Sequence, residues 1–302
     1  MQPTALERVL IASDGLDGMA VALDKAAMIE HYTGAQLLAV QTVYDRIAEE
    51  PPGVLPAAQQ VELIEALKAA ERRALQAVAG PVQARVASLE LQVAWHRQSA
   101  EAIADAARRF QANLLIKPVS AHHPLGDYFH TPLDWALMRQ APCPVLVSRR
   151  PDWRPPHRIL AAVDIADTDH EALNAAVMAM AGTLASVLDA ELHVATAYPD
   201  LGQRVNALQV ATDFEGIKAS MRSNRHALLA DAIAAIGLEV DQIHVLEGRP
   251  AAVIPDLASR IEATVTVLGT AARHGLSKLV IGNTAEDLIS RLAGDLLTVR
   301  AS

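Results

Sequence analysis

One stretch of the sequence decides the fold: Val265-Thr-Val-Leu-Gly-Thr-Ala-Ala-Arg-His-Gly-Leu-Ser-Lys-Leu-Val-Ile-Gly-Asn-Thr-Ala-Glu-Asp287. The uncharged, β-branched run from Ala263 to Leu268 predicts a buried strand. Gly269 is expected to end that strand, and a loop then leads to a helix that starts near Asn283. Asn283 and Glu286 have the spacing of a capping box. Strand, loop and helix N-terminus in this order favour an anion, because free N–H groups and the helix dipole both stabilise a phosphate.

The loop has a glycine at each end and charged side chains in its middle. Gly269 and Gly282 would let the backbone approach a ligand closely. Arg273 and His274 would pair with a phosphate, although solvated loop charges explain these two residues nearly as well. This region is therefore a candidate phosphate site.

The chain repeats itself with an offset of about 150 residues. Arg8-Val-Leu-Ile-Ala-Ser-Asp14 returns as Arg158-Ile-Leu-Ala-Ala-Val-Asp164, and the strand at 112–117 returns at 263–268. A stretch with three prolines lies between the copies and predicts a linker. We therefore expect an N-terminal domain at 1–150, a linker at 151–157 and a C-terminal domain at 158–302.

Strand and helix patterns alternate within each copy. The first copy predicts strands at 9–13, 36–42, 89–95, 114–119 and 144–148, and helices at 19–32, 57–79, 99–111 and from Pro132, with Ser99 as a helix cap and Gly80-Pro81 as a helix stop. The second copy predicts helices near 171–188, 217–236 and 251–261. This alternation predicts two tandem α/β domains, each a doubly wound parallel sheet. Ligands of such sheets bind outside the carboxyl ends of the strands, where the strand order reverses.

The glycine loop resembles the universal stress protein family, whose nucleotide-binding members carry Gly-x2-Gly-x9-Gly followed by Ser or Thr. Gly269 and Gly282 match the outer glycines, Ala272 takes the place of the middle one, and Asn283 stands at the hydroxyl position with Thr284 behind it. The spacing is kept while two of the four diagnostic residues differ. The segment 282–286 is similar to the two-domain E-type members.

The resemblance implies where a ligand would bind. In the family, the aspartate at the end of the first strand meets the adenine, a backbone stretch at the end of the second strand assists, and the glycine loop wraps the phosphates. The residues that this places around ATP, or another adenine nucleotide, are Asp164, Val194, Leu268, Gly269, Ala272, Gly282, Asn283 and Thr284. They all lie in the C-terminal copy.

The N-terminal copy resembles the family in shape more than in its site. Asp14 is kept, although a strand-end aspartate that caps the next turn explains it better than a contact with a base. Lys117-Pro118-Val119 replaces the Leu-Gly-Thr of the second copy, and Thr131-Pro132 replaces Gly-Asn. Pro118 removes a backbone donor where a nucleotide would need one. The E-type N-terminal domain also lacks the glycine motif, so no nucleotide is expected here.

The overall composition excludes several classes of protein. A net charge of −9 argues against a nucleic-acid or anionic membrane surface. One cysteine, Cys143, fits a reducing compartment and is expected to be buried and inert. The N-terminus has no signal-peptide pattern, and no apolar run is expected to span a membrane. We therefore expect a cytoplasmic protein with no nucleic-acid or membrane partner.

Neither a metal site nor a catalytic site stands out. His122, His123, Asp127 and His130 form a loop cluster that would hold zinc only with an ordered geometry. The chain has no phosphate-binding Gly-x4-Gly-Lys, no Gly-x-Ser-x-Gly and no His-Glu-x2-His. The absence of these motifs favours a protein that is not a dedicated enzyme.

The resulting prediction is a tandem stress-response sensor or adaptor that binds an adenine nucleotide in its C-terminal domain. The alternatives are a ligand-free module that acts through protein partners and a weak adenine-nucleotide hydrolase. Both copies end in a short apolar strand, at 144–148 and 296–299. Single-domain family members associate there as homodimers, so the two domains are expected to pack with pseudo-twofold symmetry as an intramolecular pseudo-dimer. A homodimer of whole chains is a further possibility.

Overall fold

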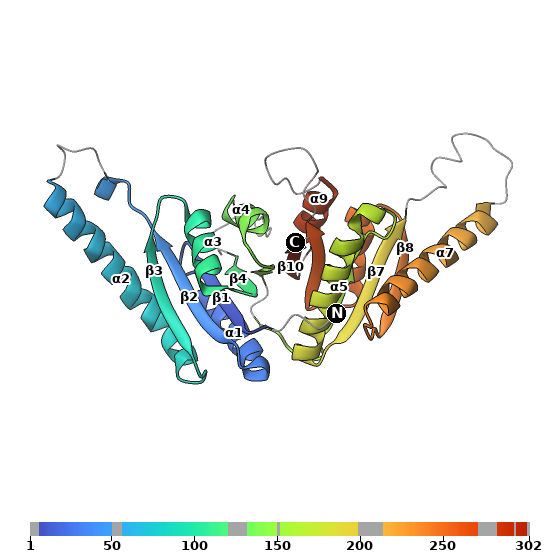
Figure 1. Cartoon of the computed structure of the whole chain (residues 1–302), viewed down its shortest axis with the longest axis horizontal. Coiled ribbons are helices and arrows are strands. Elements are labelled where there is room, and N and C mark those ends of the chain that lie inside the picture. The colour runs from blue at the N-terminus through green and yellow to red at the C-terminus, as the bar shows by residue number, and fades with distance from the viewer. Residues whose placement is uncertain are drawn as a thin grey trace. The chain divides into compact units, whose positions relative to one another are not determined.

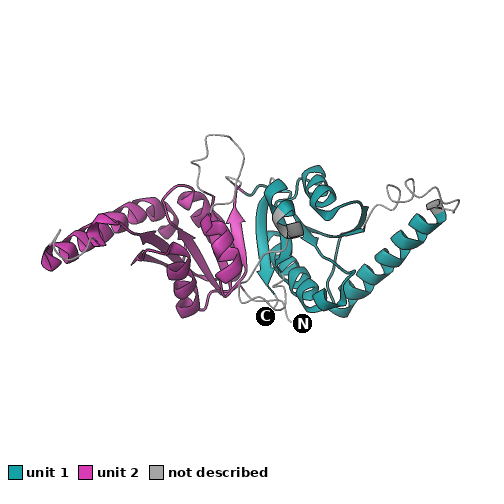
Figure 2. Cartoon of the chain, turned by 90° about the horizontal axis from the view of Figure 1, so that it is seen from above, with its two compact units in different colours: residues 1–4, 153–302 teal, residues 5–152 magenta. Residues whose placement is uncertain are grey.

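The computed structural model describes residues 6–49, 56–119, 132–149, 152–198, 214–270, 283–292 and 294–300. These residues form two compact units (Figure 2), an N-terminal unit within 5–152 and a C-terminal unit within 153–302. Side chains are described throughout these ranges except at 214–215 and 283–286. Each unit is an α/β domain built on a parallel sheet, which confirms the predicted fold class.

The N-terminal unit has five parallel strands in the order β3-β2-β1-β4-β5. Helices α1 and α2 pack together, as do α3 and α4, so two helical layers cover the sheet (Figure 1). The elements are β1 (Arg8–Ser13), α1 (Met19–Thr33), β2 (Gln36–Val43), η1 (Ile47–Glu49), α2 (Ala57–Gln83), β3 (Leu89–Trp95), α3 (Ser99–Phe110), β4 (Leu114–Pro118), α4 (Pro132–Gln140) and β5 (Val145–Ser148).

The C-terminal unit repeats this order as β8-β7-β6-β9-β10, again with parallel pairs throughout. Its helices pair in the same way, α5 with α7 and α8 with α9. The elements are β6 (Arg158–Ala162), η2 (Thr168–His170), α5 (Glu171–Leu188), β7 (Glu191–Tyr198), α7 (Phe214–Ala235), β8 (Gln242–Glu247), α8 (Pro250–Arg260), β9 (Val265–Thr270), α9 (Asn283–Arg291) and β10 (Asp295–Arg300).

Helix α5 is the most apolar helix of the C-terminal unit. The segment Thr168–Leu188 is long and apolar enough to cross a membrane by length and composition, with a mean hydropathy of 1.4. The expectation that no apolar run reaches this length is therefore wrong. However, 56 % of this segment is buried inside the protein, because α5 packs on β6, β7, β9 and β10. Its composition is that of a core helix.

Two local predictions about helix ends are wrong because tertiary packing overrides them. Helix α2 does not stop at Gly80-Pro81 but continues to Gln83. Pro81 removes one helical donor, yet the Ala84 N–H still donates to the Gly80 carbonyl at 3.2 Å and Val82 is buried in the core. Ser99 is the first residue of α3 rather than its cap, and its Oγ instead accepts a 2.9 Å hydrogen bond from Thr42 Oγ1.

The predicted linker contains a residue that belongs to the C-terminal unit. The Trp153 indole N–H donates to Asp295 Oδ2 at 2.8 Å, and both residues are buried. Asp295 is the first residue of β10. Trp153 therefore fixes the start of the C-terminal unit against its last strand, 142 residues later in the sequence.

Candidate functional site

The strand order of the C-terminal unit reverses between β6 and β9. Ala162, the last residue of β6, pairs with Ala195 of β7 on one side and with Leu268 of β9 on the other. Asp164 follows β6 by two residues. The carboxyl ends of these strands are the place where doubly wound sheets bind ligands, so Asp164 lies at the edge of the sheet where a ligand is expected.

The backbone of Asp164 is held by a side chain that the sequence analysis missed. The Asp164 N–H donates to Asn174 Oδ1 at 3.1 Å, and Asn174 Nδ2 donates to the Asp164 carbonyl at 2.7 Å. Asn174 is buried in α5. Because one amide satisfies both backbone groups of Asp164, the position of this residue above the sheet is fixed. An asparagine within an apolar helix was the only signal in the sequence.

The carboxylate of Asp164 faces solvent and shapes the following turn. Asp164 Oδ1 accepts the Ala166 N–H at 3.1 Å. His170 Nδ1 lies 3.7 Å from Asp164 Oδ2 and 4.0 Å from Asp167 Oδ2. The Asp164 side chain is 59 % exposed, so these contacts are screened and weak. The exposed carboxylate is free to accept a hydrogen bond from a ligand amine.

Gly269 is not the end of β9, as the sequence predicted, because the strand continues to Thr270 and Gly269 pairs with Val299 of β10. A Cβ atom at Gly269 would lie 2.8 Å from Cγ and Cδ2 of Leu173. Leu173 is in the first turn of α5. Close packing of this helix on the strand therefore explains the glycine without any ligand.

Val194 was also predicted at the end of a strand, and that location is wrong. Strand β7 runs to Tyr198, and Val194 lies near its middle, paired with Ala161 and Ile243. Its side chain is fully buried. The apolar run continues beyond the position that the sequence analysis chose. Leu268 is buried as well and lines the same part of the sheet.

The remaining predicted residues are described only in part. Ala272 and Gly282 lie outside the described residues, as do His122, His123, Asp127 and His130. Asn283 and Thr284 form the start of α9, and their side chains are not described. Because α9 connects β9 to the parallel strand β10, the helix begins on the carboxyl-end side of the sheet. The roles of these residues stay predictions.

In the N-terminal unit, a buried ion pair lies at the corresponding position. Lys117 Nζ is 3.2 Å from Asp134 Oδ1, and both side chains are fully buried. The same ammonium donates to the Pro118 carbonyl at 2.6 Å. A Cβ atom at Gly18, which precedes α1, would lie 2.9 Å from Pro118 Cβ. The carboxyl end of β4 is thus filled by this unit's own side chains.

A second buried lysine lies at the adjacent strand. Lys25 of α1 donates from Nζ to Ser148 Oγ at 2.8 Å, and both residues are buried. The loss of the motif glycines in this copy does not by itself predict a buried charge. A lysine inside the apolar strand β4 and an aspartate in the first turn of α4 were the available signals for the buried ion pair.

Comparison with known proteins gives one consistent result. Residues 5–149 and residues 156–300 each match the universal stress protein family. A universal stress protein E homolog of Haemophilus influenzae is 30 % identical over 278 residues, which cover 89 % of this chain and 88 % of that protein. Universal stress protein E of Escherichia coli K12 is 32 % identical over 220 residues, which cover 70 % and 68 % of the two chains.

Among solved structures, a protein of unknown function from Pseudomonas aeruginosa PAO1 is similar over the full length. The TM-score is 0.72 at 28 % identity, with 99 % of this chain and 94 % of that chain covered. The repeated sheet order agrees with two family matches in one chain. This chain therefore belongs to the universal stress protein family and carries two of its domains in tandem.

Proposed function

We propose that the C-terminal domain binds ATP, or another adenine nucleotide, at the carboxyl ends of β6 and β9. The observation that carries this proposal is the pair of hydrogen bonds between Asn174 and the backbone of Asp164, which fixes that backbone while leaving the carboxylate exposed. In this position the carboxylate accepts a hydrogen bond from the adenine amino group, and the buried side chain of Leu268 forms the wall beneath the adenine.

The phosphates would lie against the glycine loop and the start of α9. Gly269 is the second-to-last residue of β9, and Ala272, Gly282, Asn283 and Thr284 follow with the spacing of the family motif. The N–H groups of the first turn of α9 and the helix dipole stabilise negative charge. Ala272 weakens binding if its position needs a positive φ angle, because alanine then costs about 1–2 kcal/mol.

We propose that the N-terminal domain, at about residues 1–150, carries no nucleotide and that residues 151–157 link it to the C-terminal domain at 158–302. The buried pair of Lys117 with Asp134 supports the absence of a nucleotide from the N-terminal domain, since both side chains lie at the end of β4 with no exposed surface. A chain with a ligand site in one domain, and with its own side chains at the corresponding position of the other, suits a cytoplasmic sensor or adaptor of the stress response. In this proposal its ligand is a small molecule, with neither nucleic acid nor membrane as a partner.

A ligand-free module that acts through protein partners is the second candidate. The contact between Leu173 and Gly269 favours it, because helix packing accounts for that glycine without a nucleotide. Ala272, at the middle glycine position of the motif, points in the same direction. The two candidates differ in whether the purified chain binds ATP.

Calorimetric titration of the full chain with ATP separates the two candidates. We expect weak binding at one site per chain, about tenfold tighter binding by the Ala272→Gly variant, and no binding by Gly282→Asp, because a carboxylate there repels phosphate. If none of the three proteins binds, or if Gly282→Asp binds as well as the parent, the ligand-free module is the function that remains. Two ATP per chain would contradict the division between the domains.

A further inference from the structure

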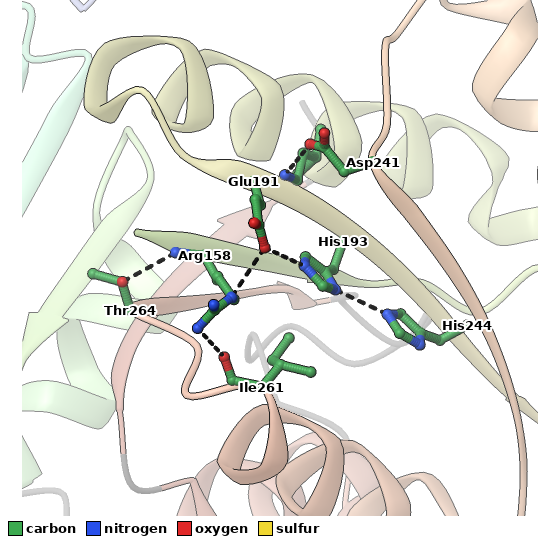
Figure 3. Close-up of polar contacts among 8 residues, drawn as sticks. Arg158, Glu191, His193, Asp241, His244, Ile261 and Thr264 are labelled. Atoms are coloured by element: carbon green, nitrogen blue, oxygen red, sulfur yellow. Dashed lines mark hydrogen bonds and ion pairs between the residues drawn. The ribbon is translucent and has the colours of Figure 1, made fainter. Parts of the chain in front are cut away.

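A chain of polar side chains crosses the C-terminal sheet at the amino ends of its strands, away from the candidate nucleotide site (Figure 3). Arg158 Nε donates to Glu191 Oε2 at 3.0 Å, and the same oxygen lies 3.5 Å from His193 Nε2. His193 Nδ1 and His244 Nε2 are 2.9 Å apart. His193 is 6 % exposed and His244 is partly buried. The four residues lie on β6, β7 and β8.

The two imidazole rings lie end to end. Their planes are within 6° of parallel, and their centroids are 5.2 Å apart. The distance between the centroids is about the 2.9 Å nitrogen–nitrogen distance plus the distance from each centroid to its own ring nitrogen. This is possible only if both nitrogens lie on the line that joins the centroids. The two rings therefore share nearly one plane, and their facing nitrogens have room for a single N–H between them.

The number of protons on the pair decides whether this hydrogen bond exists. Because the Glu191 carboxylate only accepts, it favours a proton on His193 Nε2. In the neutral pair, His244 Nε2–H then donates to His193 Nδ1. One proton taken from water leaves a positive charge on the pair but still only one N–H in the contact. A second proton places two N–H groups and two positive charges face to face, so the hydrogen bond is lost.

Burial and nearby positive charges oppose the second proton. Burial lowers the pKa of His244 below its ordinary value, and the charges of His193 and of Arg260 on α8 lower it further. The Arg158 guanidinium has two partners: Nη1 donates to the Ile261 carbonyl at 3.2 Å, and Nε donates to Glu191.

Two further charged groups near β8 have partners of their own. Asp241, which precedes β8, accepts the Leu192 N–H at 2.7 Å. On the side of α7, Lys218 pairs with Glu247 at 2.8 Å. Glu191 is thus the carboxylate that the structure places against the histidine pair.

His244 lies on a strand with little apolar burial. β8 is the outer strand of the C-terminal unit's own sheet and is hydrogen-bonded there to β7. Every residue of β8 is partly or fully exposed, so apolar burial holds it weakly. We propose that the His193–His244 hydrogen bond is an acid-sensitive latch that holds β8 on β7 and opens when both rings are protonated.

The direction of the pH effect follows from the lowered pKa of His244. The unfolded chain takes up this proton near the ordinary histidine pKa of 6.5, while the folded chain takes it up only at lower pH. The stability of the latch is therefore complete above pH 6.5 and decreases as the pH falls through the window below it.

Amide hydrogen exchange of the full-length protein tests the latch. We expect the protection of β8 amides, corrected for the intrinsic rate at each pH, to fall at least about tenfold relative to β9 amides between about pH 7.5 and about pH 5. His244→Gln keeps a donor to His193 but does not titrate, so its β8 protection is expected to stay constant. His226→Gln removes an exposed imidazole of α7 in the same unit and is expected to behave like the parent.

A further variant distinguishes a latch from a merely structural contact. Glu191→Gln removes the carboxylate that stabilises positive charge on the pair, so β8 is expected to open at a lower pH than in the parent. A structural role alone would instead make β8 exchange faster at every pH. The latch is wrong if parent β8 protection does not change with pH, or if His244→Gln is as acid-sensitive as the parent.

Discussion

At the scale of single residues, the environment of a side chain decides its chemistry more than its type does. Asn174 lies in an apolar helix, yet it holds the backbone of Asp164. Cys143 lies between Pro142 and Pro144, two residues before β5, and is only partly buried, although the sequence predicted a buried side chain. Burial raises the pKa of its thiol to about 12. Only a thiolate reacts quickly, so the raised pKa predicts a slowly reacting cysteine in the folded protein.

We expect native Cys143 to react with a thiol-specific reagent far more slowly than a free cysteine does. With a pKa of about 12, the thiolate fraction at about pH 8 is on the order of 10⁻⁴. The absorbance of the released chromophore measures the rate, and the same protein in urea is the control, since unfolding removes the burial. Labelling of the native protein at the speed seen in urea would contradict the buried environment.

At the scale of elements, each unit joins its fourth strand to the neighbouring helices in a different way. In the N-terminal unit, Lys117 of β4 pairs with Asp134 of α4. In the C-terminal unit, Gly269 of β9 receives the side chain of Leu173 from α5. An ionic contact and an apolar contact thus stabilise the same region of two similar sheets.

Removal of one partner of the buried ion pair is expected to destabilise the N-terminal unit strongly. Asp134→Ala leaves a buried ammonium without its carboxylate and should cost about 3–5 kcal/mol in urea unfolding. The double variant Lys117→Met, Asp134→Leu should recover most of that loss, because no buried charge remains. The matched control is Glu65→Ala, which breaks the exposed pair with Lys68 and should cost at most about 1 kcal/mol. Equal losses for Asp134→Ala and Glu65→Ala would contradict this expectation.

At the scale of the whole molecule, the chain carries two domains of the universal stress protein family in tandem. The two units have the same strand order, and each ends in an apolar strand, β5 or β10. Trp153, which was predicted to lie in the linker, is packed on the C-terminal unit. The pseudo-twofold packing of the two domains stays a prediction of the sequence.

Small-angle X-ray scattering of the full chain tests that packing. If the domains form an intramolecular pseudo-dimer, the distance distribution has one maximum and changes little when a flexible segment is inserted between residues 151 and 152. Two separated maxima, or a clear expansion after the insertion, would show that the linker alone joins the domains.

The sequence by itself determined the fold class, the duplication and most of the elements. Alternating strand and helix patterns, repeated at an offset of about 150 residues, are local signals that any parallel α/β domain must contain. The start of α4 at Pro132 is confirmed for the same reason, since proline suits the first turn of a helix. The glycine spacing pointed to the carboxyl ends of β6 and β9 as a candidate site.

Only the tertiary structure decided which side chains meet there and elsewhere. Leu173 against Gly269, Lys117 against Asp134, and His193 against His244 join residues 17 to 96 positions apart in the sequence. Their contacts depend on strand register, such as His193 opposite Gln242, and on how each helix packs across its sheet. A local pattern specifies which face a residue occupies but not the residue that lies opposite it, because register is set by the packing of the whole sheet.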